Sequence, residues 1–230
     1  MASSIQKLYT QIPSTYELIN HILTFGLDIW WRKRAVKKVN SAHGQRWLDV
    51  CTGTGETASY LSRISKNGNQ VFATDFSLPM ISLAKNKSEN TQVNFSLSEI
   101  KNLPFPDNTF DIVTISFATR NINTNYQDLI KSFIEIRRVL KSGGCFINLE
   151  TSQPINKTIQ FIFHWYVKIF IRPIGSSISG SKSAYAYLAS TIPKFYNANE
   201  LNQILIESGF ASVKYKKMLF GAAAIHLAQK

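Results

Sequence analysis

The sequence has few cysteines and no long apolar run. Two cysteines, Cys51 and Cys145, occur among its 230 residues, which is too few for a disulfide framework and typical of a reducing compartment. No charge-free apolar run reaches the ~18 residues needed to cross a bilayer. Because Glu17 interrupts the first apolar stretch, no signal peptide is expected. These absences predict a cytoplasmic protein.

Acidic residues are also scarce relative to basic ones. The chain has 14 acidic residues against 26 lysines and arginines, a net charge of +12. Such an excess favours an anionic partner, which can be a nucleic acid, an anionic membrane surface or a phosphate-bearing substrate. Part of the excess lies at residues 32–38, directly after Trp30 and Trp31. A solvated helix face explains this cluster equally well.

The rest of the composition is that of an ordinary globular protein. With 44% hydrophobic and 17% charged residues, the chain is not disordered, collagen-like or a coiled coil. Its length fits one domain. We expect residues 1–44 to form a helical cap within this domain and residues 45–230 to form its main part, with an aromatic-rich insertion at 154–194.

Short apolar strands alternate with amphipathic helices beyond residue 45. Predicted strands cover 46–51, 71–74, 93–97, 111–117, 145–149, 213–219 and 222–228, and predicted helices cover 56–64, 79–87, 126–140 and 199–208. This alternation predicts right-handed crossovers and a doubly wound α/β fold with a mostly parallel, seven-stranded sheet. The last two strands, joined near Gly221, are expected to place an antiparallel strand at the sheet edge.

Polar residues follow the carboxyl ends of the predicted strands. The segment 49–55 ends the first strand, Asp75 the second and Glu99 the third, and Arg120 and Asn121 follow the fourth. Ligands of such sheets bind at the carboxyl ends of the strands. Since the chain has only 14 acidic residues, three of them at one edge predict a binding site.

The glycine-rich turn after the first strand limits the classes of ligand that can bind. Gly53 and Gly55 let the backbone approach a ligand closely, and Asp75 follows at about the 20-residue separation where an acid meets ribose hydroxyls. A nicotinamide dinucleotide site would share these features. Asp49, inside the strand, discriminates because a carboxylate there suits a ligand with ammonium and sulfonium groups better than a pyrophosphate. S-adenosylmethionine is such a ligand.

Several motifs extend this prediction to a family. Residues 48–55 (LDVCTGTG) resemble the first motif of class I S-adenosylmethionine-dependent methyltransferases. The chain resembles the C-methyltransferases of menaquinone and ubiquinone biosynthesis at 16–20 (YELIN), 24–31 (TFGLDIWW), 103–111 (LPFPDNTFD), 116–121 (SFATRN), 138–144 (RVLKSGG), 150–154 (ETSQP) and 178–188. It departs from the family pattern at Glu17 (Asp in the family), Asp28 (His), Thr52 (Gly), Glu99 (Asp or Asn) and Ser142 (Pro).

The resemblance implies a Rossmann-like methyltransferase fold with S-adenosylmethionine as cofactor. It places Gly53 and Gly55 beside the methionine moiety, Asp75 at the ribose and Glu99 at the adenine. The expected cofactor-binding residues are Asp49, Thr52, Gly53, Gly55, Asp75, Phe76, Glu99, Ile100 and Ser116. Capping of a helix N-terminus is the structural alternative for Asp75 and Glu99. No metal site is expected.

The resemblance also implies methylation of a ring carbon in a reduced polyprenyl quinone precursor, most simply demethylmenaquinol to menaquinol. The carbon must be electron-rich, so the substrate is the hydroquinone and a phenol proton leaves. Arg120 is expected to stabilise the phenolate and orient a water, and Asn121 and Tyr16 to bind the ring oxygens. His226 is an alternative base. The structural alternative for Arg120 is a surface ion pair.

An apolar segment, residues 159–171, lies close to Lys157, Lys168 and Arg172. It is too short to span a membrane, but its aromatic and basic residues predict contact with a membrane interface or with a polyprenyl tail. A core helix is the alternative. The expected partners are therefore a prenylated hydroquinone and, peripherally, the anionic inner face of the cytoplasmic membrane. No nucleic acid is expected as a partner. The oligomeric state stays open, and a homodimer is one option.

Three other functions fit parts of the sequence. A soluble small-molecule O- or N-methyltransferase is one, because some departures from the family pattern lie in substrate-facing segments. An RNA-binding methyltransferase is another, which would bind through the basic residues 32–38 with strong salt dependence. The third is a binding protein that keeps the fold without turnover.

Overall fold

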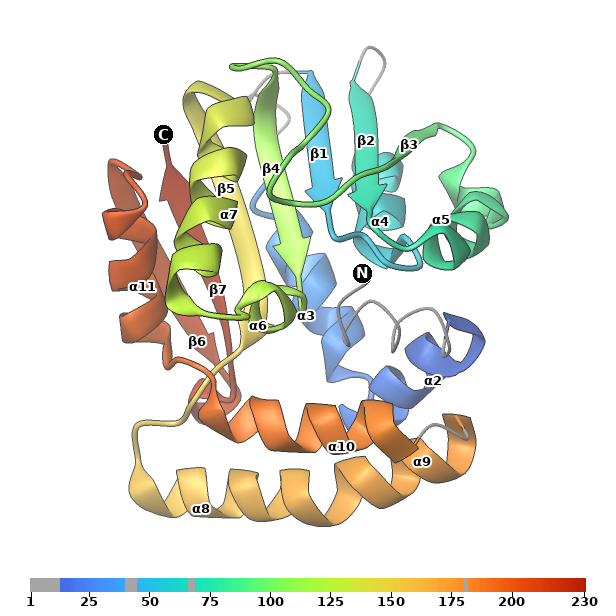
Figure 1. Ribbon diagram of the computed structural model, residues 1–230, viewed down its shortest axis with the longest axis vertical. Coiled ribbons are helices and arrows are strands. Elements are labelled where there is room, and N and C mark those ends of the chain that lie inside the picture. Colours follow the sequence, from blue (N-terminus) through green and yellow to red (C-terminus); the bar gives the residue numbers. More distant parts are fainter. Residues whose placement is uncertain (1–12, 40–44, 66–68, 180–181) are drawn as a thin grey trace.

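A seven-stranded sheet forms the centre of the computed structural model, which describes residues 13–39, 45–65, 69–179 and 182–230 (Figure 1). Its strands are β1 (Arg46–Val50), β2 (Gln70–Asp75), β3 (Val93–Leu97), β4 (Phe110–Ser116), β5 (Leu140–Thr151), β6 (Ser212–Met218) and β7 (Ala223–Gln229). They lie in the order β3-β2-β1-β4-β5-β7-β6. The predicted doubly wound sheet of seven strands is confirmed.

The first five strands of the sheet are parallel, and β7 is antiparallel to both of its neighbours, β5 and β6. The predicted antiparallel pair is therefore present, but its antiparallel member lies one position in from the edge. The sequences of the two strands explain this order. β7 is apolar and almost wholly buried, whereas β6 exposes Lys214, Lys216 and Lys217, and charged side chains are typical of an edge strand.

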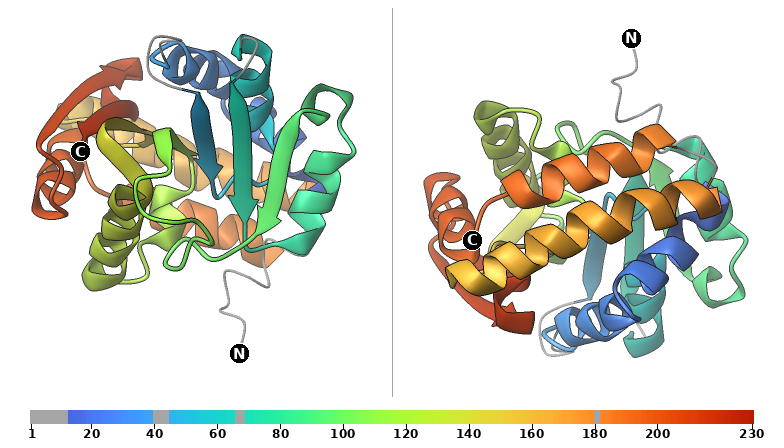
Figure 2. Two further views of the ribbon diagram at one scale, coloured as in Figure 1. Left: turned by 90° about the horizontal axis from the view of Figure 1, so that it is seen from above. Right: turned by 90° about the horizontal axis from the view of Figure 1, so that it is seen from below.

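Helices cover both faces of the sheet. On one face pack α3 (Leu27–Val36) and α4 (Glu56–Ile64), and on the other α7 (Tyr126–Val139) and α11 (Ala198–Glu207) (Figure 2). Successive residues of a strand point to opposite faces, so Trp47 packs in the first layer and Leu48 in the second. The two apolar layers hold the strand ends in fixed positions.

A third apolar cluster lies beyond the carboxyl ends of the parallel strands (Figures 1 and 2). It joins α2 (Pro13–Leu23) to the predicted aromatic-rich insertion. The insertion consists of α8 (Lys157–Tyr166), the π-helical turn η2 (Val167–Ile171), α9 (Arg172–Ser179) and α10 (Lys182–Thr191). A Cβ atom on Gly175 would lie 2.1 Å from the Tyr185 ring, so α9 and α10 pack in contact at a position that only glycine allows. Of the predicted helical region 1–44, residues 1–12 and 40–44 lie outside the described residues.

The predicted bounds are close to the observed ones except at β5. The strand predicted for 145–149 begins five residues earlier, directly after α7, with Leu140 paired to Phe110 before a register shift. Gly143, at φ 75°, donates its N–H to the Lys230 carbonyl, which keeps this irregular stretch in the sheet. The shorter elements are α5 (Leu78–Lys85), α6 (Thr119–Ile122), η1 (Ser88–Asn90), η3 (Ile192–Lys194) and η4 (Leu219–Gly221).

Candidate active site

Two adjoining cavities lie at the carboxyl ends of the parallel strands. The larger has a volume of about 380 Å³ and is lined by α2, α3, α8, η2, α10 and the segments after β4 and β5. The smaller is lined by the loop after β1, the end of β2 and the segment after β4. Arg32 and Phe117 line both cavities. A ligand in one cavity therefore lies next to a ligand in the other.

The glycine-rich loop after β1 and the Asp75 carboxylate together form the smaller cavity. Gly53 donates its N–H to Asp75 Oδ2 at 2.8 Å, and Ser77 donates its N–H to Oδ1 at 2.9 Å. Ser77 precedes α5, so Asp75 does not cap that helix. A carboxylate has about four acceptor positions, so Asp75 keeps acceptor capacity for a ribose hydroxyl group. This arrangement fits the ribose of S-adenosylmethionine.

The two glycines of this loop have different roles. Both have positive φ, 56° for Gly53 and 81° for Gly55, a region that favours glycine. A Cβ on Gly55 would lie 2.8 Å from Asn90 Nδ2, whereas a Cβ on Gly53 would meet nothing within 4 Å. Gly55 thus allows close packing at the start of α4. Gly53 lines the smaller cavity and leaves its backbone accessible to a ligand.

Asp49 lies beneath the loop and outside both cavities. Its Oδ2 accepts the Thr52 hydroxyl at 2.6 Å, and its Oδ1 accepts the Thr114 hydroxyl at 2.6 Å. Burial raises the pKa of Asp49 from 3.8 to about 6, although the two hydroxyls and Arg32 oppose the shift. The Asp49 carboxylate therefore anchors Thr52, which belongs to the glycine-rich loop after β1 (the cofactor loop).

We expect Asp49→Asn to stabilise the ligand-free protein at pH 7–8. A carboxyl whose folded-state pKa is raised favours folding when protonated, and this contribution is lost as the pH rises through about 6. The amide avoids that loss, since the two threonine hydroxyls can either donate or accept. The free energy of unfolding in urea should exceed that of the unmodified protein by about 1–3 kcal/mol at pH 8 and by nearly nothing at pH 4.

Asp111→Asn is the matched control of opposite sign. Burial raises the pKa of Asp111, but the Lys141 ammonium and the Arg46 N–H outweigh burial and lower it overall. This variant should lose stability at pH 8 and approach the unmodified protein as the pH falls. A pH dependence in Asp49→Asn equal to that of the unmodified protein would contradict the role given to the Asp49 carboxyl.

Arg120, on α6 directly after β4, lines the larger cavity together with three other charged residues, Asp28, Arg32 and Glu150. Its side chain is 6% exposed, its Nη1 donates to Thr191 Oγ1 at 2.7 Å, and its Nε has no hydrogen-bond partner. Glu150 Oε2 accepts the backbone N–H of Arg120 at 3.0 Å, and its Oε1 accepts the N–H and the hydroxyl of Thr151. None of the ion pairs found among the described residues includes Arg120. It is thus no surface ion-pair partner, and its guanidinium offers an unused donor and a positive charge to the cavity.

The structure places the other predicted cofactor residues in two groups. Thr52, Phe76, Ser116 and Asn121 line the smaller cavity together with Gly53 and Asp75. Glu99 is exposed and Ile100 half-buried, and neither lines the larger or the smaller cavity. The turn that carries them still lies beside the cofactor loop, because the Ser98 N–H donates to the Asp75 carbonyl at 3.0 Å. Asn121, predicted for the substrate, is thus on the cofactor side.

Two further predicted residues are placed less directly. Tyr16 lies on α2, but its side chain is outside the described part of the chain. His226 is fully buried on β7, where its Nε2 lies 2.8 Å from the Ala198 carbonyl oxygen. Burial lowers the pKa of His226 to about 4. Since it lines neither cavity, it is no candidate for a base.

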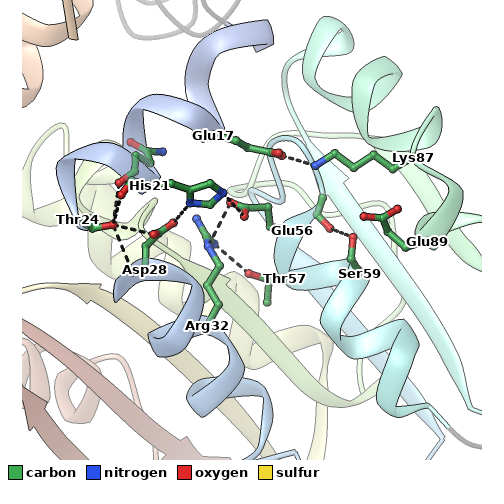
Figure 3. A network of polar contacts seen from close by, with 12 residues as sticks. Glu17, His21, Thr24, Asp28, Arg32, Glu56, Thr57, Ser59, Lys87 and Glu89 are labelled. Carbon is green, nitrogen blue, oxygen red and sulfur yellow. Dashed lines mark hydrogen bonds and ion pairs between the residues drawn. The ribbon is translucent and has the colours of Figure 1, made fainter. Parts of the chain in front are cut away.

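A polar network between the two cavities escaped the sequence analysis (Figure 3). His21 Nδ1 lies 2.8 Å from Asp28 Oδ2, and His21 Nε2 lies 3.4 Å from Glu56 Oε1. Arg32 Nε lies 3.4 Å from Glu56 Oε2, and Arg32 Nη1 donates to Thr57 Oγ1 at 3.0 Å. Arg32 is therefore buried and does not extend the basic stretch at the surface. The only hint in the sequence was the departure from the family pattern at Asp28. Nothing in the neighbouring residues indicated that Asp28 contacts His21.

Comparison with known proteins agrees with the geometry. Residues 2–230 match the ubiE/COQ5 methyltransferase family. A demethylmenaquinone methyltransferase of Thermus thermophilus is 35% identical over 97% of this chain and 100% of its own. The ubiquinone/menaquinone biosynthesis C-methyltransferase UbiE of Desulfotalea psychrophila is 33% identical over 96% of this chain and 88% of its own.

Solved structures show the same fold. An S-adenosylmethionine-dependent methyltransferase of Thermotoga maritima has a TM-score of 0.70 at 18% identity, over 98% of this chain and 99% of that one. A Haemonchus contortus phosphoethanolamine N-methyltransferase, solved with S-adenosylhomocysteine, has a TM-score of 0.67 at 15% identity, over 100% of this chain and 60% of that one. The chain therefore belongs to the ubiE/COQ5 methyltransferase family and is an S-adenosylmethionine-dependent C-methyltransferase.

Proposed function

We propose that this enzyme methylates a ring carbon of a reduced polyprenyl quinone precursor, most simply demethylmenaquinol. The observation that carries the proposal is the larger cavity, which combines an apolar wall with the buried guanidinium of Arg120, whose Nε has no hydrogen-bond partner among the described residues. A hydroquinone ring with a prenyl tail needs both features, because its ring and tail are apolar and its oxygens become negatively charged. The names of the relatives support the same substrate class.

The smaller cavity is proposed to hold the cofactor. Asp75 would accept the ribose hydroxyls, and Gly53 and Thr52 would lie along the methionine moiety, with Asn121 and Ser116 across the cavity. Bound S-adenosylmethionine supplies an electrophilic methyl group on a sulfonium sulfur. Because the two cavities share Arg32 and Phe117, a cofactor in one would lie next to a substrate ring in the other, as a direct methyl transfer requires.

The larger cavity is proposed to hold the ring and the first part of the tail. Its apolar wall includes Leu23, Trp31, Phe163, Val167, Ile171 and Ile192. Loss of a phenol proton makes the ring carbon nucleophilic and leaves negative charge on oxygen. Arg120 would stabilise this charge, since a donor and a positive charge already fixed in a buried site need no reorganisation during the reaction.

The cavity also bears on the rival functions. A polar small molecule would leave most of the apolar wall without contacts, which disfavours a general O- or N-methyltransferase. An RNA-binding surface at residues 32–38 is weakened because Arg32 is buried against Glu56 and Thr57. Arg120 forms no ion pair among the described residues, and a buried charge without a counter-ion destabilises the folded state. This disfavours a binding protein without turnover, which would have no use for the charge.

The substrate proposal is tested by anaerobic incubation of the purified protein with S-adenosylmethionine and a short-chain demethylmenaquinol. Mass spectrometry should show the gain of one methyl group on carbon with the hydroquinone and none with the oxidised quinone. A gain with both forms would contradict the phenolate mechanism. No gain with either form, while cofactor binding persists, would contradict the substrate class.

The exposed face of α8 is proposed to contact the anionic inner face of the cytoplasmic membrane. Phe161 is 71% and Trp165 52% exposed, with Lys157 and Lys168 exposed beside them, a pattern typical of interfacial helices. Ile162 is both exposed and part of the larger cavity, so this face continues into the substrate site. No helix in the described ranges is long and apolar enough to cross a bilayer.

We expect the double variant Phe161→Ser/Trp165→Ser to bind anionic vesicles at least about ten-fold more weakly, because each aromatic ring buries apolar area worth about 1.5–3 kcal/mol. Co-sedimentation with phosphatidylglycerol-containing vesicles measures the effect. The control is Ile134→Ser/Ile206→Ser, which removes two similarly exposed apolar side chains on α7 and α11. Equal losses in both double variants would mean that α8 is not the contact face.

A further inference from the structure

We infer that Asp28 is the proton acceptor of the methyl transfer and that His21 is its positioning residue. The inference rests on the proposed function, because the proton comes from the hydroxyl group of the acceptor. The network in Figure 3 carries it. Arg120 can stabilise a phenolate but, as a permanently protonated group, is a poor acceptor for the proton itself.

Asp28 is a carboxylate held at the wall of the substrate cavity. It is 2% exposed, lines the larger cavity, and accepts the Thr24 hydroxyl on Oδ1 at 2.7 Å. His21 Nδ1 lies 2.8 Å from Oδ2. These two contacts use about half of the acceptor positions of a carboxylate. A hydroxyl group of a bound hydroquinone can occupy another, which is the geometry that a general base needs.

The charges around Asp28 match this role. They are His21 and Glu17 on α2, Arg32 on α3, Glu56 on α4, Arg120 after β4 and Glu150 on β5. His21 lies between the Asp28 and Glu56 carboxylates, and Arg32 lies against Glu56. Donors from His21 and Thr24 keep the Asp28 carboxyl in one orientation. Glu17 is occupied by Lys87 on the far side of the network.

The proton balance of the reaction gives the network a direction. The ring carbon forms a C–C bond with the methyl group, the sulfonium S–C bond breaks, and the hydroxyl proton moves to Asp28 while its O–H electron pair stays on oxygen and feeds the ring. The oxygen regains a proton when the methylated carbon loses its hydrogen, so one proton leaves per turnover. The His21 side chain is 28% exposed against 2% for Asp28, so His21 connects the cavity wall to solvent.

The same three residues resemble a metal site, but their contacts favour a proton site. Ligand atoms of His21, Asp28 and Glu56 lie within 4.8 Å of one another. However, the two imidazole nitrogens face different carboxylates, and Arg32 already places a positive charge 3.4 Å from Glu56. His21, on α2, thus pairs with a carboxylate that lies on the cavity side.

The test compares Asp28→Asn with the unmodified enzyme on the short-chain demethylmenaquinol. We expect kcat to fall about 10²-fold, the KM values for both substrates to change far less, and the acid limb of the pH profile to disappear. Cofactor affinity by calorimetry and the melting temperature should stay close to those of the unmodified protein. Unchanged kcat with an unchanged acid limb would overturn the inference. Inactivity of the unmodified enzyme on every reduced quinone would instead overturn the proposed function.

Two further variants separate proton transfer from structure. His21→Gln should lower kcat with little change in either KM, because the Asp28 carboxylate loses the donor that fixes its orientation. The control His164→Gln, which alters another histidine bonded to a polar side chain, Gln153, should leave kcat unchanged. The swap His21→Asp/Asp28→His should recover much of the kcat lost in Asp28→Asn. If the swap does not recover kcat, and if the swap and Asp28→Asn both have a lower melting temperature and weaker cofactor binding, Asp28 has a structural role instead. Activity that requires an added divalent cation would likewise overturn the inference.

Discussion

Replacement of Arg120 by glutamine is expected to lower kcat about 10²–10³-fold while cofactor affinity stays nearly unchanged. The guanidinium is buried at the base of the larger cavity, its Nε has no partner, and its Nη1 is held by Thr191. Such a group stabilises negative charge that develops on the substrate oxygen, and removal of one donor of this kind typically has this effect on kcat. Glutamine can still reach Thr191 but carries no charge.

The same variant should be more stable than the unmodified protein in the absence of substrate. A buried charge without a counter-ion destabilises the folded state, and the glutamine removes it. Stability and activity therefore change in opposite directions, which separates this result from partial unfolding. Calorimetric titration with S-adenosylhomocysteine, urea unfolding and anaerobic turnover measure the three quantities.

Arg46→Gln is the control for Arg120→Gln. Arg46 begins β1, and its guanidinium packs over the Phe72 and Phe110 rings at the end of the sheet away from the cavities. Its loss should lower stability through lost packing and leave kcat unchanged. An Arg120 variant whose activity falls only in step with its melting temperature would argue against charge stabilisation.

The sheet and the cofactor loop could be predicted because their signals are local. The apolar strand 46–50, the turn at Gly53 and Gly55, and Asp75 after the second strand lie within one β-α-β unit, so crossover rules place them at one edge of the sheet. The position of β7 between β5 and β6 was not predicted, although the three lysines of β6 indicate that it is the edge strand.

The substrate side could be predicted only in part, because its residues come from distant segments. The larger cavity forms beyond the strand ends where α2 packs against η2, through Ile19, Leu23 and Val167, next to α8. Nothing in the periodicity of either segment indicates that the two pack together. The contact between His21 and Glu56 has the same origin, since it joins α2 to the helix that follows the glycine loop. Long-range packing of this kind is visible only in three dimensions.

Replacement of Asp75 by asparagine is expected to weaken S-adenosylmethionine binding by about 10²-fold or more. The carboxylate accepts the Gly53 and Ser77 N–H groups and is proposed to accept two ribose hydroxyls, and hydrogen bonds to a charged group are each worth about 1.5–3 kcal/mol. An amide offers one acceptor oxygen instead of two, so at least one ribose contact or the Gly53 contact is lost. The loss should appear in the dissociation constant measured by calorimetry.

Asp111→Asn is the matched control, because Asp111 also accepts two backbone N–H groups, from Gln45 and Arg46, but at the opposite end of the sheet. Its cofactor affinity should equal that of the unmodified protein. Burial raises the pKa of Asp75, so its carboxylate becomes protonated at a higher pH than an ordinary carboxylate does. The cofactor affinity of the unmodified protein should therefore begin to fall at that higher pH as the pH decreases. Asp75→Asn should remove this dependence. Equal affinities in the two variants would show that Asp75 serves only the loop, and the ribose contact would then have to come from another residue of the smaller cavity.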